Sequence, residues 1–207
     1  LFRGLDDRVK RWVTLNEPSS IVDGGYLHGA LAPGLRNPYA APIAAHNLLR
    51  AHATAVQTYR VEGRHQIGLA VNLEPKYPAT ETVEDLNATM RADAYRNRYY
   101  LDPVFLGSYP PELTDIFGPT WPTFADADLE LIRQPLDFLG VNYYRRQVVR
   151  HDPTVWPLAA AGVRQDRQTH TGLNWEAYPQ GLTDILQWVA SRYGSTPLYI
   201  TENGAAF

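Results

Sequence analysis

The chain has 207 residues, of which 44% are hydrophobic and 20% are charged, a composition typical of a folded globular domain rather than a disordered segment. Its formal net charge is -3 and no run of Lys or Arg forms a basic patch, so the sequence lacks the electrostatic signature of a nucleic-acid-binding protein. No apolar stretch reaches the roughly 18 residues of a membrane-spanning helix, and the absence of cysteine excludes disulfides and thiolate metal sites.

Strand and helix patterns alternate along the chain. Short apolar or alternating runs predict strands, and apolar residues spaced three or four apart predict helices. In chain order we expect a strand over 11–16, a helix over 42–60, a strand over 66–73, a helix over 83–100, a strand over 136–144, a helix over 178–194 and a strand over 197–201. This order is typical of an α/β fold with a parallel sheet.

Two further expectations concern local structure. The segment 151–175 has little periodicity and is predicted to be a long excursion between elements. In the helix over 42–60, five residues recur at helical spacing and are predicted to form the buried face: Ala44, Leu48, Ala51, Ala55 and Tyr59.

Two glutamates occupy equivalent places, each at the carboxyl end of a predicted strand. Glu17 lies in "TLNEP", where Pro18 biases it towards extended backbone, and Glu202 lies in "ITENG", where Gly204 permits a tight turn. In a barrel of parallel strands these ends converge on one face. Paired carboxylates can cleave a glycosidic bond, one protonating the leaving oxygen and the other attacking or activating water. Because most of the 22 acidic residues are expected to be solvated surface charges, position alone favours the interpretation of the two glutamates as surface charges over that of a functional pair.

The residues around these glutamates extend the pattern over nearly the whole chain. The segments that carry it are "VTLNEP", "GGYLHGALAPG", "HNLLRAHATAVQTYR", "NRYYLDPVFLGSYP", "DFLGVNYY", "WEAYPQGL" and "YITENG". In this order they resemble the family 1 glycoside hydrolases, the β-glucosidase family. Several correctly ordered segments are far more specific than any single five-residue match.

The resemblance implies a (β/α)8 TIM barrel, of which this chain covers about strands 4 to 7. Residues 1–207 would then form a single partial glycosidase catalytic domain, with strands 1 to 3 before Leu1 and strand 8 after Phe207. In residues 1–207 alone, strands four and seven would lack the neighbouring strands that they have in a complete barrel and would be open sheet edges. We therefore expect the isolated piece to fold poorly and to be inactive.

The resemblance also implies roles for five residues. Glu17 would be the general acid/base and Glu202 the nucleophile. Asn16 would hydrogen-bond the 2-hydroxyl of the sugar, a contact that strengthens in the transition state. Asn142 and Tyr144 would lie beside the nucleophile, with the tyrosine holding Glu202 oriented and ionised.

Other residues have competing interpretations. Trp175 is a candidate floor for a sugar site, although a tryptophan before a helix is also common in cores, and Asn174 stands where the family usually has glycine. Tyr99 and Tyr100 are expected to be packing residues. Glu74, followed by proline after a predicted strand, imitates the catalytic context, but the resemblance gives it no catalytic role.

The predicted function is that of a retaining β-glycosidase that hydrolyses terminal β-D-glucosyl residues, or galactosyl or fucosyl residues, through a covalent glycosyl-enzyme. The expected partners are β-glucosides such as cello-oligosaccharides or aryl and alkyl glucosides, without nucleic acid or membrane. None of the six histidines has metal-ligand spacing, so we expect neither metal nor cofactor. The lack of cysteine fits a reducing, cytoplasmic location. A 6-phospho-β-glycosidase and a non-catalytic sugar-binding barrel are the alternatives; a thioglucosidase would be expected to carry Gln in place of Glu17.

Overall fold

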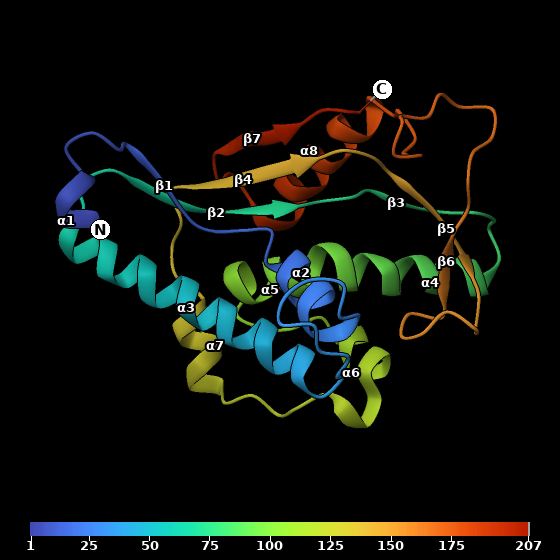
Figure 1. Cartoon of the computed structure of the whole chain (residues 1–207), viewed down its shortest axis with the longest axis horizontal. Helices are drawn as coiled ribbons and strands as arrows, with labels where there is room; N and C mark the ends of the chain where they lie inside the picture. The colour runs from blue at the N-terminus through green and yellow to red at the C-terminus, as the bar shows by residue number, and fades with distance from the viewer. Residues whose placement is uncertain (207) are drawn as a thin grey trace.

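The computed structural model describes residues 1–206, and its centre is a four-stranded parallel sheet. The strands are β1 (Arg11–Asn16), β2 (Gln66–Asn72), β4 (Phe138–Tyr143) and β7 (Leu198–Asn203), in the order β1-β2-β4-β7. All neighbouring pairs are parallel, and Figure 1 shows their arrows running the same way. The carboxyl ends of the four strands therefore meet at one edge of the sheet, and the predicted α/β fold with a parallel sheet is confirmed.

Helices follow the strands, and α3 to α7 gather below the sheet in the view of Figure 1. The α-helices are α1 (Phe2–Leu5), α2 (Pro18–Ile21), α3 (Ala40–Glu62), α4 (Val83–Asp93), α5 (Tyr99–Leu106), α6 (Glu112–Phe117), α7 (Asp126–Ile132) and α8 (Gln180–Tyr193). Two π-helical segments, η1 (Val22–Leu27) and η2 (Ala94–Arg98), and one 3-10 turn, η3 (Gly118–Thr120), connect them.

A second, smaller sheet is built from the connections that leave β2 and β4. Its strands are β3 (Lys76–Pro78), β5 (Gln147–His151) and β6 (Ala160–Gly162). β3 pairs with β5 in parallel, and β5 pairs with β6 antiparallel. The predicted excursion over 151–175 therefore contains a short strand, which its weak periodicity did not reveal.

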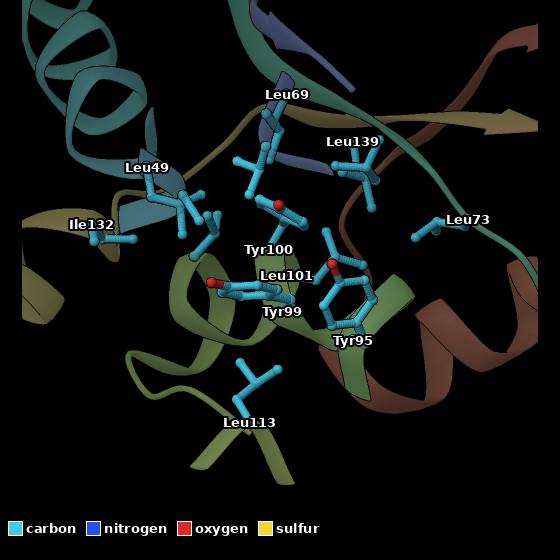
Figure 2. Packing of buried hydrophobic residues seen from close by; sticks show 14 of the residues in the cluster. Leu49, Leu69, Leu73, Tyr95, Tyr99, Tyr100, Leu101, Leu113, Ile132 and Leu139 are labelled. Carbon is cyan, nitrogen blue, oxygen red and sulfur yellow. The ribbon is translucent and has the colours of Figure 1, made fainter. Parts of the chain in front are cut away.

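The main core lies between the parallel sheet and the helices. Figure 2 shows Tyr99 and Tyr100 of α5 lying below Leu69 of β2 and Leu139 of β4. The two tyrosine rings are stacked, with centroids 4.8 Å apart, and both side chains are buried, so their predicted packing role is confirmed. Because side chains alternate along a strand, the residues between these core positions face the opposite side of the sheet.

The predicted buried face of α3 is wrong by about one position. Ala51 is exposed, and Ala44, Leu48 and Ala55 are only partly buried; of the predicted face only Tyr59 is fully buried. The buried stripe is instead formed by Ala41, Ala45, Leu49, His52, Val56 and Tyr59.

A buried histidine explains why the pattern was misread. His52 lies in the buried stripe, where its Nδ1 shares a hydrogen bond with the Thr14 hydroxyl of β1. Burial lowers the pKa of His52 to about 4, which keeps the ring neutral. A polar residue type at a core position shifts the apparent apolar face of a helix.

The helix predicted over 83–100 is interrupted by η2. This segment turns Asn97 towards the loop after β2, where its side chain exchanges two hydrogen bonds with the backbone of Glu74, each 3.0 Å long. A π-helical turn inserts one residue into a helix and re-aims a side chain. Tertiary contacts, rather than local sequence, therefore account for the interruption.

The described part of the chain contains no helix that is both long and apolar enough to cross a lipid bilayer. Within residues 1–206, no three His, Asp or Glu side chains come together as a metal-binding group.

Candidate active site

The two glutamates singled out by sequence lie at the carboxyl edge of the parallel sheet. Glu17 directly follows β1, and Glu202 lies near the end of β7, opposite Asn142 of β4. The strand order separates β1 from β7 by two strands. Their carboxylates are linked across this gap by the amide side chains of Asn16 and Asn142.

Each glutamate follows an irregularity in its strand. Between β1 and β2 the register shifts between Val13 and Asn16, and between β4 and β7 it shifts so that Ile200 pairs with Val141 but Glu202 with Asn142. Such bulges insert one residue and re-aim the side chains that follow. They account for how both carboxylates reach the same network.

Hydrogen bonds join the four side chains at this edge. Asn142 Nδ2 donates to Glu17 Oε1 (2.9 Å) and to Asn16 Oδ1 (3.0 Å), and Asn16 Nδ2 donates to Glu202 Oε1 (3.0 Å). Asn142 thus contacts Glu17 and Asn16, and Asn16 in turn contacts Glu202. The structure brings together Asn16, Glu17, Asn142 and Glu202, as the sequence analysis expected.

Asn142 is the fixed centre of this network. Its side chain is fully buried, and its Oδ1 accepts a hydrogen bond from Thr201 Oγ1 (2.6 Å). With Oδ1 accepting from a hydroxyl, Nδ2 is the atom that faces Glu17 and Asn16, so the amide orientation is set by its partners. Thr201 was not identified from sequence, because its contact depends on the bulge in β7.

Tyr144 holds the other side of Glu202. Its hydroxyl donates a hydrogen bond to Glu202 Oε2. This hydrogen bond and, to a smaller extent, burial raise the pKa of Tyr144 to about 12, so the hydroxyl stays protonated and available as a donor. Glu202 therefore accepts hydrogen bonds on both oxygens, one from Asn16 and one from Tyr144.

The backbone of Glu17 differs from the sequence expectation. Pro18 was expected to favour extended geometry, but Glu17 is left-handed, with φ 46° and ψ 63°. Left-handed backbone is strained for a residue with a side chain and is commonly found at functional sites. Glu17 N–H donates to Ala70 O (2.9 Å), and Ser20 Oγ donates to Glu17 Oε2 (3.0 Å), which hold this conformation.

Ser20 was missed by the sequence analysis. It lies three residues after Glu17 on α2, where one helical turn returns its hydroxyl to the carboxylate. The "EPSS" segment contains that spacing, so the signal was present. The expected turn directly after Glu202 is also absent: β7 continues through Glu202 to Asn203, whose side chain donates to Tyr143 O (2.7 Å).

Trp175 lies at the rim of this cluster. Its ring centroid is 5.4 Å from that of Tyr144, and the guanidinium of Arg145 lies 5.6 Å from the tryptophan ring. Asn174, where the family usually has glycine, is left-handed with φ 62°, a conformation that asparagine tolerates better than most residues. Trp175 is partly buried.

Glu74 lies at the same edge of the sheet but outside the glutamate pair. Its carboxylate forms ion pairs with Lys76 and with Arg145 Nε (2.7 Å). Burial raises the pKa of Glu74, but the positive charges of Lys76, Arg145 and Arg96 outweigh burial and lower it to about 2. Glu74 is therefore a buried, ionised carboxylate with cationic partners.

This arrangement can hold two carboxylates with different surroundings at one open edge. Glu202 accepts from an amide and a phenol, whereas Glu17 accepts from an amide and an alcohol. A carboxylate pair with fixed positions is suited to acid/base and nucleophilic chemistry at a glycosidic carbon.

A parallel α/β sheet with paired carboxylates at the carboxyl ends of its strands defines the class of barrel glycoside hydrolases, of which this chain forms a partial α/β fold. Comparison with known sequences places the chain within that class. The chain belongs to glycosyl hydrolase family 1, because the sequence model of that family matches residues 1–207.

Known proteins agree with this assignment. The chain is 39% identical over 209 residues to Beta-glucosidase A of Thermotoga maritima, and 38% identical over 209 residues to the 1,4-beta-D-glucan glucohydrolase of Thermotoga neapolitana. These alignments cover 100% of this chain but 46% and 49% of those proteins. The chain spans about half the length of the curated relatives it matches.

Solved structures show the same fold. The family 1 glycoside hydrolase of Thermotoga maritima, complexed with a cyclophellitol analogue transition-state mimic, superposes with a TM-score of 0.95 at 39% identity, over 100% of this chain and 47% of that one. A beta-glucosidase from Exiguobacterium marinum gives a TM-score of 0.94 at 36% identity, over 100% and 48%. The neighbours are TIM-barrel glycosidases, which confirms that the four strands are part of such a barrel.

Proposed function

We propose that residues 1–207 belong to a single catalytic domain that hydrolyses β-D-glucosides with retention of configuration. The proposal rests on one observation. Glu17 and Glu202, which lie 185 residues apart in the sequence, are linked by a chain of hydrogen bonds through the side chains of Asn142 and Asn16. The asparagine that donates to Glu17, Asn142, is fully buried, which is not expected of the partner of a solvated surface charge. The proposal applies to the full-length protein that contains this chain.

In the first step, the Glu202 carboxylate attacks the anomeric carbon and the glycosidic bond breaks. Glu17, protonated, gives its proton to the departing oxygen, so the aglycone leaves as a neutral alcohol and the sugar is esterified to Glu202. The two hydrogen bonds to Glu202, one on each carboxylate oxygen, hold the carboxylate in a fixed orientation for the attack.

In the second step, Glu17 acts as a base. It removes a proton from water, which attacks the same carbon and releases the sugar from Glu202. Two inversions restore the β configuration. Asn16 donates to Glu202, and in this mechanism it also contacts the 2-hydroxyl of the sugar, which lies beside the bond being broken.

The proposed substrates carry a terminal β-D-glucosyl group, as in cello-oligosaccharides or aryl and alkyl glucosides. The names of the two Thermotoga relatives support this class, and one structure of the Thermotoga maritima enzyme is described as a complex with deoxynojirimycin. Galactosyl and fucosyl substrates belong to the same proposal. The presence of both glutamates in one network supports an enzyme over a non-catalytic sugar-binding barrel.

Stereochemistry tests the mechanism. The open reading frame that encodes residues 1–207 is expressed at full length, and the first-formed product from an aryl β-glucoside is followed by proton NMR. We expect β-glucose to appear first, before mutarotation. Initial release of α-glucose would refute the nucleophilic role of Glu202, because a direct attack by water inverts the configuration.

Azide separates the two glutamates. With Glu202→Gly, azide occupies the vacated space and should yield an α-glucosyl azide. With Glu17→Ala, azide should instead attack the glucosyl-enzyme and yield a β-glucosyl azide. The same azide anomer from both variants would contradict the assignment of different roles.

Leaving-group dependence is a second measure of Glu17. In Glu17→Gln the proton donor is lost, so alkyl glucosides should lose far more activity than an activated aryl glucoside. Including a 6-phospho-β-glucoside in the same panel tests the phosphorylated alternative: clear preference for it would replace the glucoside proposal.

A further inference from the structure

Glu74 is a buried carboxylate that is held by contacts of both its side chain and its backbone. Its side chain is 7% exposed, and its carboxylate pairs with Lys76, whose side chain is 4% exposed, and with Arg145. Its backbone N–H and C=O are both bound by the side chain of Asn97 from η2. Contacts to both its backbone and its side chain therefore hold the carboxylate that pairs with Arg145.

From Arg145, contacts lead directly to the candidate nucleophile. Arg145 Nε donates to Glu74 Oε1 (2.7 Å), and its guanidinium lies over the ring of Trp175. Trp175 in turn contacts the ring of Tyr144, whose hydroxyl donates to Glu202. Each link joins two planar or ionic groups of defined geometry.

We propose that Glu74 and Arg145 are positioning residues, which hold Trp175 against Tyr144 and thereby fix the hydrogen bond to Glu202. This inference rests on the proposed function, since it concerns the orientation of its nucleophile. Neither residue touches the reacting atoms; both act through Trp175 and Tyr144.

The chemistry of arginine suits this role. Its planar guanidinium can donate from Nε to the carboxylate while its face lies on an aromatic ring, which a lysine ammonium cannot do. The side chain of Arg145 is 41% exposed, so its removal exposes little new core. Removal would instead free one face of Trp175, and through it the ring of Tyr144.

A purely structural ion pair is the competing interpretation, and the chain contains a matched example. Arg192 pairs with Asp102 at 2.7 Å, with side-chain exposures of 34% and 4%, and its guanidinium lies 5.7 Å from the ring of Tyr193. These values resemble those of Arg145, Glu74 and Trp175. The Arg192 pair joins α8 to α5, however, and contacts none of the site residues described above.

The test compares Arg145→Met with Arg192→Met in the full-length protein, using an activated aryl β-glucoside. We expect Arg145→Met to lower kcat about 10-fold with little change in KM, because small displacements in such a site can cost up to about 10²-fold. Arg145→Lys should recover only part of kcat.

The two variants are also compared by thermal midpoint. If Arg192→Met lowers kcat as much as Arg145→Met at a similar loss of midpoint, the effect is general destabilisation and the proposal fails. A change in KM alone would mean that Arg145 contacts the substrate, which also overturns it. Glu74→Gln is a weaker probe of positioning, because it leaves Lys76 buried with one ionic partner fewer and so lowers stability as well.

A double-mutant cycle tests the path through Trp175. In the Trp175→Phe background, Arg145→Met should change kcat less than 2-fold, because the ring that it positions is already altered. Additive losses would show that Arg145 acts independently of Trp175 and would refute the proposal. An inactive unmodified protein would instead refute the proposed function, so the two failures are distinguishable.

Discussion

Replacing Asn142 by aspartate exchanges the amide NH2 group for an oxygen, so a hydrogen-bond donor to Glu17 becomes a negatively charged acceptor. The Nδ2 that donates to Glu17 Oε1 at 2.9 Å becomes a carboxylate oxygen, which faces another carboxylate. The side chain is fully buried, so solvent reaches it poorly. We expect the two acidic groups to share a proton that Glu17 alone would release at lower pH.

The size of the effect follows from the separation. Two unit charges about 4 Å apart interact by about 4 kcal/mol at an effective dielectric constant of 20, and one pH unit corresponds to about 1.4 kcal/mol. Glu17 is only partly buried, which reduces the interaction. The basic limb of the kcat/KM profile should therefore move to higher pH by about 1 to 3 units. Because the groups titrate together, the limb reports the pair.

The assay measures kcat/KM between about pH 4 and about pH 10. The substrate is an alkyl β-glucoside, because its poor leaving group depends most on proton donation. Asn142→Ala is the matched control, since it removes the same hydrogen bonds without adding a charge. It should lower activity while leaving the basic limb close to its original pH. An unmoved limb in Asn142→Asp, or equal movement in both variants, would refute the placement of Asn142 beside the catalytic acid.

Three other changes have defined outcomes. Tyr144→Phe removes the donor to Glu202 and should lower kcat about 10- to 100-fold, with the thermal midpoint nearly unchanged, since one exchanged hydrogen bond contributes about 1 kcal/mol to stability; an unchanged kcat would contradict the contact. Gly140→Ala should lower kcat because the new Cβ would lie 2.9 Å from the Thr201 side chain and displace β7, whereas full activity would mean that β7 adapts. The pKa of Glu74 is lowered from about 4.5, the ordinary value of a glutamate, to about 2 in the folded protein, so ionised Glu74 contributes stability above about pH 4.5 that is lost as pH falls towards 2. The difference in urea midpoint between the unmodified protein and Glu74→Gln should shrink over that range; a constant difference would contradict the shifted pKa.

The parts of this site that sequence could predict are those set by strand direction. Glu17 and Glu202 were found because each follows an apolar strand, and parallel strands bring their carboxyl ends together whatever lies between them in sequence. Asn16, Asn142 and Tyr144 came with them from the family resemblance. The alternation of strands and helices was predicted for the same reason, since it depends on local periodicity.

The parts that were missed depend on contacts between distant segments. The left-handed backbone of Glu17 is held by Ala70 of the neighbouring strand, and it opposes the preference that Pro18 imposes locally. Thr201 reaches Asn142 only because β7 carries a bulge. No pattern within one segment contains these features, because each is decided by the register between two segments.

The arrangement of β4 shows how core packing determines the geometry of the site. Leu139, Val141 and Tyr143 lie in the helix-facing core, so alternation turns Gly140 and Asn142 to the opposite face. The apolar residues fix the strand against the helices, and Asn142 inherits that fixed position. At Gly140 the missing side chain leaves room for Thr201, which then orients the amide of Asn142. The separation of the two carboxylates is therefore held by the hydrophobic core on the other face of the same strand, which is why packing changes at that face should alter catalysis as well as stability.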